Sequence, residues 1–264
     1  DIEIRPEDIR IDTMRSSAVP NRLKAAQRNL DRGFGDARLF EVGPVYSGDG
    51  EKDQRRTVSA VIQPRPARHW AGAEVADVLA AKRDCLAVLE AVGAPVSALQ
   101  SAAAEVSWLH PGRGGAFKIG PKVVAVFGEL HPKSLAALDV AGPAFAFEID
   151  LDAIPAPRAK GRARPVFEKR DLMPLSRDFA FIVDEGKAAA DLVSAALRAD
   201  KTLIADVTLF DVYRGAGVPE GKKSLAIEVT LQPTDKTLTE AEIEAVSAKV
   251  IAAANKAVGG VLRG

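Results

Sequence analysis

The stretch VTLFDVYRGAGVPEGKKSLAIEVTL (Val207–Leu231) is the part of the sequence that most clearly indicates a fold. Its two ends are rich in β-branched and aromatic residues, which predicts strands over Leu203–Tyr213 and Lys222–Leu231. Between them, Gly215–Gly221 contains glycines and a proline, which is typical of a hairpin connection. We therefore expect an antiparallel pair of strands at the centre of the C-terminal half.

The elements around this hairpin give the order βαββαβ. Upstream, Phe179–Val183 predicts a strand, and Lys187–Ala199 predicts a helix with apolar residues on one side. Downstream, Thr239–Ala257 predicts a helix whose first residue is an N-cap threonine, with a glutamate three positions later to complete a capping box. A short strand, Val261–Leu262, is expected to close the series. This order is that of the ferredoxin-like fold.

The N-terminal half predicts an α+β fold built on a mostly antiparallel sheet. Helices are expected at Asn21–Gly33 with Asn21 as N-cap, at Glu74–Val92 and at Lys133–Leu138. The motif HPGRGG (His110–Gly115) is expected to form a turn between strands. The predicted strands are Ala37–Tyr46, Thr57–Gln63, Gly115–Ile119, Val123–Leu130 and Ala144–Leu151.

A change of composition separates the two halves. The segment PAPRAKGRARPVFEKR (Pro155–Arg170) holds three prolines and six basic residues against one acid, Glu168. Such a segment is typical of an extended linker. We therefore predict a first domain at 1–154, a basic linker at 155–170 and a second domain at 171–264.

Composition excludes several classes of protein. The chain has 264 residues and 36 basic against 36 acidic side chains, so it cannot bind nucleic acid through bulk charge. One cysteine, Cys85, excludes an intrachain disulfide, and it is expected to be a buried, unreactive thiol on the apolar side of a helix. The three histidines are too scattered to indicate a zinc site, and no apolar run is long enough to span a membrane.

Several blocks of the sequence, in order along the chain, resemble the C-terminal part of the β subunit of bacterial phenylalanyl-tRNA synthetases. In the second half, VTLFDVYRG (Val207–Gly215) and GKKSLAIEVTLQ (Gly221–Gln232) resemble its ferredoxin-fold anticodon-binding domain. In the first half, MRSSAVPNRLKAAQRNLDRG (Met14–Gly33), LHPGRGG (Leu109–Gly115) and FEIDLDAI (Phe147–Ile154) resemble its class II synthetase-like core. The resemblance implies an α+β chain with a partial class II-like, antiparallel-sheet core followed by the ferredoxin-like domain.

The resemblance implies that the core is not catalytic. Class II enzymes place an arginine two residues before a glutamate in the strand of their second motif, and here Leu39 stands two residues before Glu41. Arg38 is expected on the opposite face of that strand. The stretch that corresponds to the third motif, Phe145–Ile154, has neither a glycine run nor an arginine. We expect no catalytic residue and no metal ligand in this chain.

The remaining role for such a core is assembly. The helix near Asn21 corresponds to the first class II motif, which forms subunit interfaces in the family. Its stripe is a candidate interface with an α subunit, and packing inside its own domain is the alternative. The residues of this stripe are Leu23, Ala26, Gln27 and Leu30.

In the second domain, ferredoxin-like sheets suggest RNA binding by stacking and phosphate contacts. The domain has 11 Lys and Arg against 14 Asp and Glu, a net charge of −3, so any RNA contact must be local. The basic linker is a possible phosphate contact, although a flexible tether is the simpler explanation. The candidate tRNA-binding residues are Arg177, Tyr213, Arg214, Lys222 and Lys223.

The resemblance also implies partners and cellular context. The family's β subunit is longer, so we expect this sequence to be a C-terminal fragment of it. We expect tRNA(Phe) and an α subunit in an α2β2 heterotetramer as partners, no DNA or membrane, and a cytoplasmic location. ATP and Mg2+ would act in the parent complex, with no cofactor in this chain. The alternative is a scaffold that does not bind RNA independently.

Overall fold

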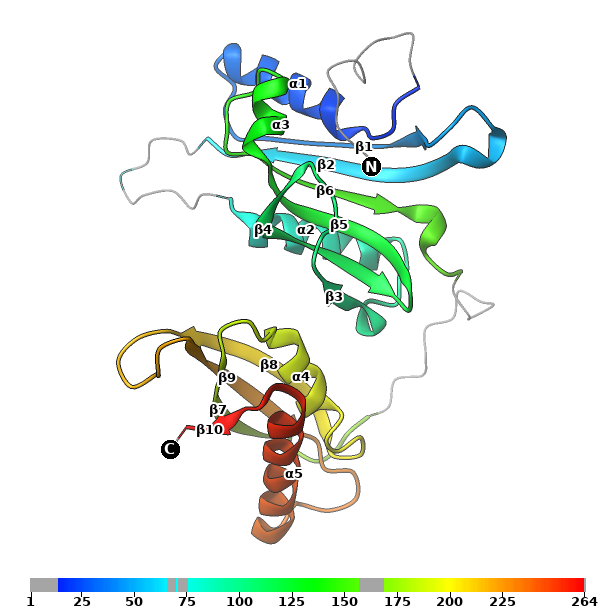
Figure 1. Ribbon diagram of the computed structural model, residues 1–264. Helices are drawn as coiled ribbons and strands as arrows, with labels where there is room; N and C mark the ends of the chain where they lie inside the picture. Colours follow the sequence, from blue (N-terminus) through cyan, green and yellow to red (C-terminus); the bar gives the residue numbers. More distant parts are fainter. Residues whose placement is uncertain (1–13, 66–69, 71–75, 157–168, 264) are drawn as a thin grey trace. The chain divides into compact units, whose positions relative to one another are not determined.

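A computed structural model describes residues 14–65, 70, 76–156 and 169–263 (Figure 1). The chain divides into two compact units, 1–161 and 162–264. The division falls inside the segment 155–170, most of which lies outside the described residues. Among the described residues, no helix is both long and apolar enough to span a membrane.

The first unit is built on a six-stranded antiparallel sheet with the order β1-β2-β6-β5-β4-β3. The short 3-10 turns η2 (Glu51–Asp53), η3 (Val96–Ala98) and η4 (Leu151–Ala153) lie in its connections. The strands are β1 (Ala37–Tyr46), β2 (Gln54–Gln63), β3 (Gln100–Ala102), β4 (Leu109–Ile119), β5 (Lys122–Leu130) and β6 (Phe145–Asp150).

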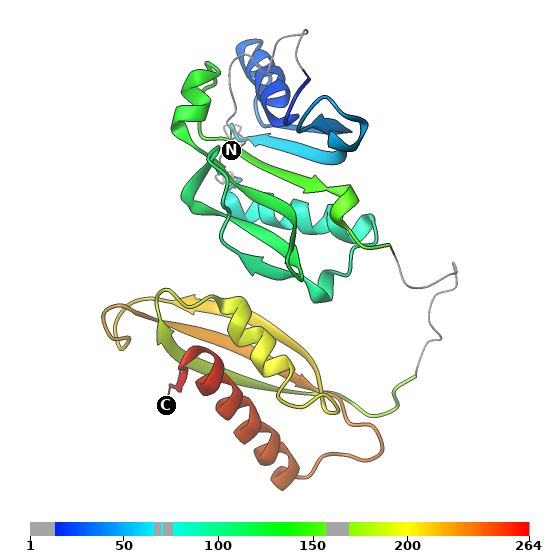
Figure 2. The same cartoon turned by 45° about the vertical axis from the view of Figure 1, so that its right-hand side comes forward.

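Helices cover both faces of this sheet (Figures 1 and 2). On one face, α1 (Val19–Asp31) and α3 (Pro132–Ala137) pack on a cluster that includes Val61 of β2. On the other face, α2 (Val78–Ala91) packs on a cluster that includes Val58. Val58 and Val61 are three residues apart in one strand and so point to opposite faces, as the pleat requires.

The helices α1 and α2 begin at residues other than those predicted. α1 begins at Val19 with Ala18 as its N-cap, so the prediction of Asn21 as the cap was wrong. Pro20 fits the first turn, because an N–H is not needed there. α2 begins at Val78, because the carboxylate of Asp77 accepts hydrogen bonds from the backbone N–H groups of the next turn. The predicted start of α2 lies outside the described residues.

The prediction of a turn at HPGRGG was also wrong. The motif belongs to β4, whose pairing with β5 is irregular between Leu109 and Gly114. A proline cannot donate to a sheet, and an irregularity of this kind accommodates Pro111 inside a strand. Gly128 faces this point, and a Cβ there would lie 2.7 Å from the Cα of Gly114, so the two strands need glycine to approach. The three-residue strand β3 was not predicted.

The second unit confirms the βαββαβ order. Its four-stranded antiparallel sheet has the order β10-β7-β9-β8, and α4 and α5 lie side by side on one face (Figure 2). Its elements are β7 (Leu175–Asp184), α4 (Ala189–Leu197), β8 (Ile204–Tyr213), β9 (Lys222–Leu231), α5 (Glu240–Val258) and β10 (Val261–Leu262).

The core of the second unit lies between this sheet and its two helices. Phe181 and Leu225 are fully buried and directly paired, and they pack with Leu192 of α4 and Val250 of α5. The residues that alternate with them point to the other face, which no helix of the described part of this unit covers. The unit therefore has one closed face and one open face.

The predicted capping box at the start of α5 is confirmed. Thr239 caps the helix, and its own N–H donates to the carboxylate of Glu242 at 2.9 Å. That bond and the ammonium of Lys236 at 2.9 Å lower the pKa of Glu242 to about 2. The helix ends at Gly259, which adopts a left-handed conformation with φ of 65°.

A buried carboxylate joins α5 to the loop before β8. Asp200 accepts hydrogen bonds from the N–H groups of Thr202 at 3.0 Å and Leu203 at 3.1 Å, and from Lys249 Nζ at 2.8 Å. Its side chain is only 8% exposed. The Lys249 and Thr202 hydrogen bonds hold the pKa of Asp200 far below its usual range. Asp200 therefore stabilises the fold only while it is ionised.

We predict that Asp200→Asn destabilises the second unit by about 2 kcal/mol at pH 7, because charged hydrogen bonds are lost. The lowered pKa means that this contribution is present at neutral pH and disappears as the pH falls below the usual range of an aspartate. Urea unfolding at pH 7 and pH 3 tests this. The exposed Asp235→Asn is the control, and an equal effect of the two variants would contradict the prediction.

Candidate functional site

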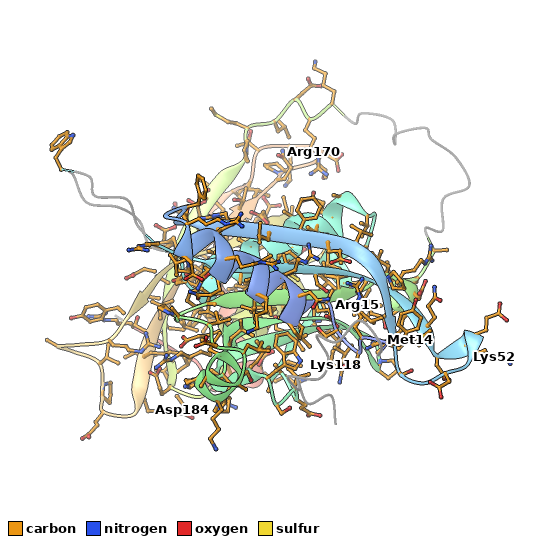
Figure 3. The ribbon with its side chains drawn as sticks, turned by 90° about the horizontal axis from the view of Figure 1, so that it is seen from above. Met14, Arg15, Lys52, Lys118, Arg170 and Asp184 are labelled. Carbon is orange, nitrogen blue, oxygen red and sulfur yellow. The ribbon has the colours of Figure 1, made fainter. Side chains whose placement is uncertain are left out.

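The face of the first sheet that carries α1 holds a carboxylate between two arginines. Glu41 of β1 lies 2.6 Å from the guanidinium of Arg15 and 2.7 Å from that of Arg22. The hydrogen bond from Arg15 is the main cause that lowers the pKa of Glu41. Arg15 also holds the end of β1, since its carbonyl accepts from the N–H of Tyr46 at 2.9 Å. Figure 3 labels Met14 and Arg15, which precede α1.

The neighbouring positions on β1 agree with the predicted alternation. Leu39 shares the face of Glu41 and packs against the cluster under α1. Arg38 points to the other face, where its guanidinium lies 3.6 Å from the carboxylate of Asp84 on α2. No arginine of β1 therefore shares the face on which a class II motif would present one.

A second carboxylate continues the same row across the sheet. Ser59 of β2 is paired with both Glu41 and Glu148 of β6. One oxygen of Glu148 accepts hydrogen bonds from the hydroxyls of Ser17 at 2.6 Å and Ser59 at 3.0 Å. Both carboxylates of the row are thus bound by side chains of the same chain. In the described part of the chain, no three His, Cys, Asp or Glu side chains are grouped so that they could hold a metal ion.

The candidate interface stripe on α1 lies mostly inside the first unit. Leu23 and Ala26 are fully buried in the cluster with Val61. Gln27 is half-buried, and its side-chain amide oxygen accepts a hydrogen bond from the backbone N–H of Ala141 at 2.8 Å. Leu30 is also half-buried. A partner can therefore reach only the half-buried members of this stripe, so the interface remains a prediction.

Four of the five candidate RNA-binding residues lie together where β8 and β9 are joined. The guanidinium of Arg214 donates to the carboxylate of Glu185 at 2.7 and 3.0 Å, and Lys222 lies 3.0 Å from Asp184. The Arg214 hydrogen bonds lower the pKa of Glu185. Lys223 is 9% exposed and donates to the backbone carbonyl of Glu185 at 2.7 Å. We define this group, with Tyr213, as the hairpin end.

Tyr213 presents an aromatic ring at the hairpin end. It is 38% exposed, and its hydroxyl donates to the carbonyl of Ala216 at 3.3 Å. The guanidinium of Arg263 lies over its ring, 5.4 Å from the centroid. Arg263 follows β10 in sequence, and nothing in the sequence pattern indicated that it would reach this ring.

Arg177 is separated from the hairpin end. It pairs with Val229 on β9, whereas Tyr213 pairs with Ser224 and Lys222 with Asp184. Seven residues along β7 divide it from Asp184, which corresponds to roughly 23 Å. A single nucleotide cannot contact both Arg177 and the hairpin end.

The open face of the second sheet is lined by acidic residues, and this acidic surface was not predicted from the sequence. Asp178 and Glu228 are paired on neighbouring strands, and Thr208 pairs with Glu228 on the other side. Asp206 lies two residues along β8 and accepts from the hydroxyl of Thr208 at 3.1 Å. The alternation of buried and exposed positions in the strands was the signal that could have found these acids.

The other chemically distinctive residues of the sequence have structural surroundings. Cys85 is fully buried, and burial raises the pKa of its thiol to about 12. His110 and His131 each accept a hydrogen bond from a backbone N–H two residues later, at 3.1 Å in both cases. Of the six basic residues of the linker, only Lys169 and Arg170 are among the described residues.

Comparison with known families gives two matches. The model described as "Phenylalanyl tRNA synthetase beta chain CLM domain" matches residues 5–151. The model described as "Ferredoxin-fold anticodon binding domain" matches residues 173–263. Together they cover both units.

Similar curated proteins are phenylalanine–tRNA ligase β subunits. That of Bradyrhizobium diazoefficiens is 51% identical over 257 residues, which are 95% of this chain and 32% of the relative. That of Paramagnetospirillum magneticum is 52% identical over 258 residues, 96% of this chain and 32% of the relative. That of Rhodospirillum rubrum is 49% identical over 257 residues, with coverage of 96% and 32%. The chain thus spans about a third of the length of these relatives.

We predict that Glu41→Gln destabilises the first unit by roughly 2 kcal/mol at pH 7, a value between those of exposed and buried ion pairs. The change leaves Arg15 and Arg22 without their carboxylate. Because the pKa of Glu41 is lowered from 4.5, its contribution is complete at neutral pH and is lost as the pH falls below that value.

Asp84→Asn is the matched control for this prediction. Asp84 also lies near two arginines, at 3.6 and 3.1 Å, but these side chains are more exposed. In chemical unfolding, this variant should lose less than about 1 kcal/mol of unfolding free energy. Equal destabilisation by the two variants would mean that Glu41 has no special role.

Proposed function

This chain belongs to the phenylalanyl-tRNA synthetase β-chain family, and on that premise we propose that it supplies anticodon recognition and subunit packing for a phenylalanine–tRNA ligase. The observation that carries the proposal is the hairpin end of the anticodon-binding domain, where an exposed aromatic ring lies beside cationic side chains. The ligase would join phenylalanine to tRNA(Phe) with ATP and Mg2+, at a site on an α subunit in an α2β2 assembly. Its place would be in cytoplasmic protein synthesis.

The cationic side chains Arg214 and Lys222 of the hairpin end can bind phosphate without the loss of a strong interaction. The Arg214–Glu185 pair has side chains 56% and 48% exposed, and the Lys222–Asp184 pair 41% and 64%. Exposed pairs of this kind contribute little because solvent screens them, so a phosphate can replace the carboxylate. Lys223 differs, because it is buried against a backbone carbonyl and serves the fold of the hairpin.

The acidic open face limits how RNA can approach. Asp178, Glu228 and Asp206 repel phosphate, but carboxylate oxygens accept hydrogen bonds from the N–H groups of base edges. A ring such as Tyr213 offers a stacking surface to an unpaired base. We infer that bases contact the sheet side of the hairpin end and that phosphates lie near Arg214 and Lys222.

The first unit fits assembly better than catalysis. ATP activation needs fixed positive charge near the transferred group. Leu39 occupies the position of the class II arginine, and Arg15 and Arg22 are already engaged by Glu41. These residues do not fit an ATP and Mg2+ site, so we assign the first unit a role in packing against the α subunit through the accessible part of α1.

A scaffold that does not bind RNA independently is the second candidate. Two observations favour it: the second unit has a net charge of −3, and Arg214, Lys222 and Lys223 all have partners within the unit. In that case, tRNA would bind only with help from other modules of the assembly.

We predict that the 264-residue chain binds tRNA(Phe) more tightly than a tRNA with an altered anticodon. Tyr213→Ala should remove most of this preference, and Lys222→Ala should weaken binding to both tRNAs about equally and reduce the salt dependence. Filter binding at low and moderate salt measures both effects, with the exposed Lys256→Ala as the control. Equal binding of both tRNAs by the unaltered chain would favour the scaffold.

We also predict that the chain forms no phenylalanyl adenylate. The rate of pyrophosphate exchange with phenylalanine, ATP and Mg2+ should stay at background for the chain alone. Exchange should appear only when a catalytic α subunit is added. Exchange by the chain alone would overturn the assignment of the first unit to assembly.

A further inference from the structure

A cleft on the α1 side of the first sheet is unrelated to the RNA-binding surface. Its inner part is a cavity of 160 Å³ between β2, β5, β6 and the segment before β4. Trp108, which is 3% exposed, forms one wall together with Val106 and Val126. Thr57, Glu148 and Arg55 complete the lining on the polar side.

A wider hollow of 410 Å³ adjoins this cavity, and we call it the mouth. Arg55, Val123 and Asp150 line both hollows, and we treat the two together as one cleft. The mouth is lined by Lys122 of β5 and by Lys52 at the tip of the β1–β2 hairpin, which is labelled in Figure 3. The cleft therefore combines a mostly apolar inner part with a mouth lined by three cationic side chains, Lys52, Arg55 and Lys122, and two acidic ones, Asp150 and Asp152.

The acids of the cleft are already engaged. Asp150 accepts from the N–H groups of Asp152 and Ala153, at 3.0 and 3.1 Å, and Asp152 lies 2.6 Å from the guanidinium of Arg56. Glu148 accepts from its two serines, as described above. Each of these three carboxylates is thus bound by donors of the same chain.

The donors of the cleft, in contrast, are not fully used. Arg55 Nε is buried and has no hydrogen-bond acceptor in the described part of the chain, and its guanidinium reaches Asp150 only at 3.4 Å. Lys52 and Lys122 form no ion pair with a described residue. The Arg55 side chain is 34% exposed, so the accessible part of its guanidinium and the two lysines could form charge-assisted hydrogen bonds to an anion.

The size of the inner cavity limits the apolar part of a ligand. Apolar cavities of about 150 Å³ in proteins take up a molecule the size of benzene. A cavity of 160 Å³ therefore accommodates one six-membered ring or one branched alkyl group.

We propose that this cleft binds a small carboxylate whose single ring or branched alkyl group enters the inner cavity beside Trp108, while its carboxylate reaches Arg55 and Lys122. The carboxylate would compete with Asp150 for the Arg55 guanidinium, whose contact with Asp150 is long at 3.4 Å, and the apolar group would cover Val106 and Val126. The proposal uses no residue of the hairpin end, so failure of either proposal leaves the other intact.

The test is a titration of the 264-residue chain with 3-phenylpropionate. The sequence has two tryptophans, and Trp70 is 94% exposed, so a Trp70→Phe background makes Trp108 the only fluorescent indole. We expect a saturable change in its emission and a rise in the thermal midpoint. 3-Phenylpropan-1-ol, which lacks the charge, and propionate, which lacks the ring, should each bind at least fivefold more weakly.

Two variants identify the contacts. Arg55→Gln and Lys122→Gln should each weaken 3-phenylpropionate binding at least fivefold, and the exposed Lys133→Gln on α3 is the control. Lys122 makes no described ion pair, so this variant tests the proposal even if Arg55→Gln fails to fold. The proposal is overturned by no saturable change up to about 10 mM, by equal binding of the alcohol, or by unchanged binding to Lys122→Gln.

Discussion

The carboxylate of Glu41, held between Arg15 and Arg22, is the interaction on which the first unit depends. Its partners come from the segment before α1 and from α1 itself, so one ion cluster fixes helix, segment and edge strand together. A partly buried charge is stable only while its partners are present, and this constraint fixes the position of α1 on the sheet. The carboxylate and both arginines are therefore engaged with one another inside the first unit.

The second unit differs from the first in that its charges line an open face of its sheet. Its two helices cover one face of the sheet, and acids line the other, so the unit as a whole repels a polyanion. Recognition of RNA by such a unit must rest on short-range contacts at the hairpin end, where weak, exposed ion pairs can exchange a carboxylate for a phosphate. Specificity would come from bases, because the acids of the open face penalise contacts that follow the phosphate backbone.

Local patterns of the sequence predicted most of the second unit and less of the first. The bounds of β9 and β10, the βαββαβ order and the Thr239–Glu242 cap follow from alternation and capping chemistry, which act over a few residues. The sequence could not indicate β3, because three residues carry no periodicity, or the strand through Pro111, because its tolerance depends on a bulge paired with β5. The sequence could also not indicate that Arg177 lies away from the hairpin end, because only the register of strand pairing separates them. Partners such as Arg22 for Glu41 are nineteen positions apart, a distance over which no pattern acts.

A photocrosslink from position 213 is the most direct test of whether the hairpin end contacts the anticodon loop of tRNA(Phe). A photoreactive phenylalanine analogue in place of Tyr213, in the 264-residue chain bound to tRNA(Phe), would join the protein to whichever nucleotide lies beside that ring. We expect crosslinks that are confined to the anticodon loop and that disappear when unlabelled tRNA(Phe) competes for the chain. Crosslinks to the acceptor stem, or bound tRNA with no crosslink from this position, would contradict it.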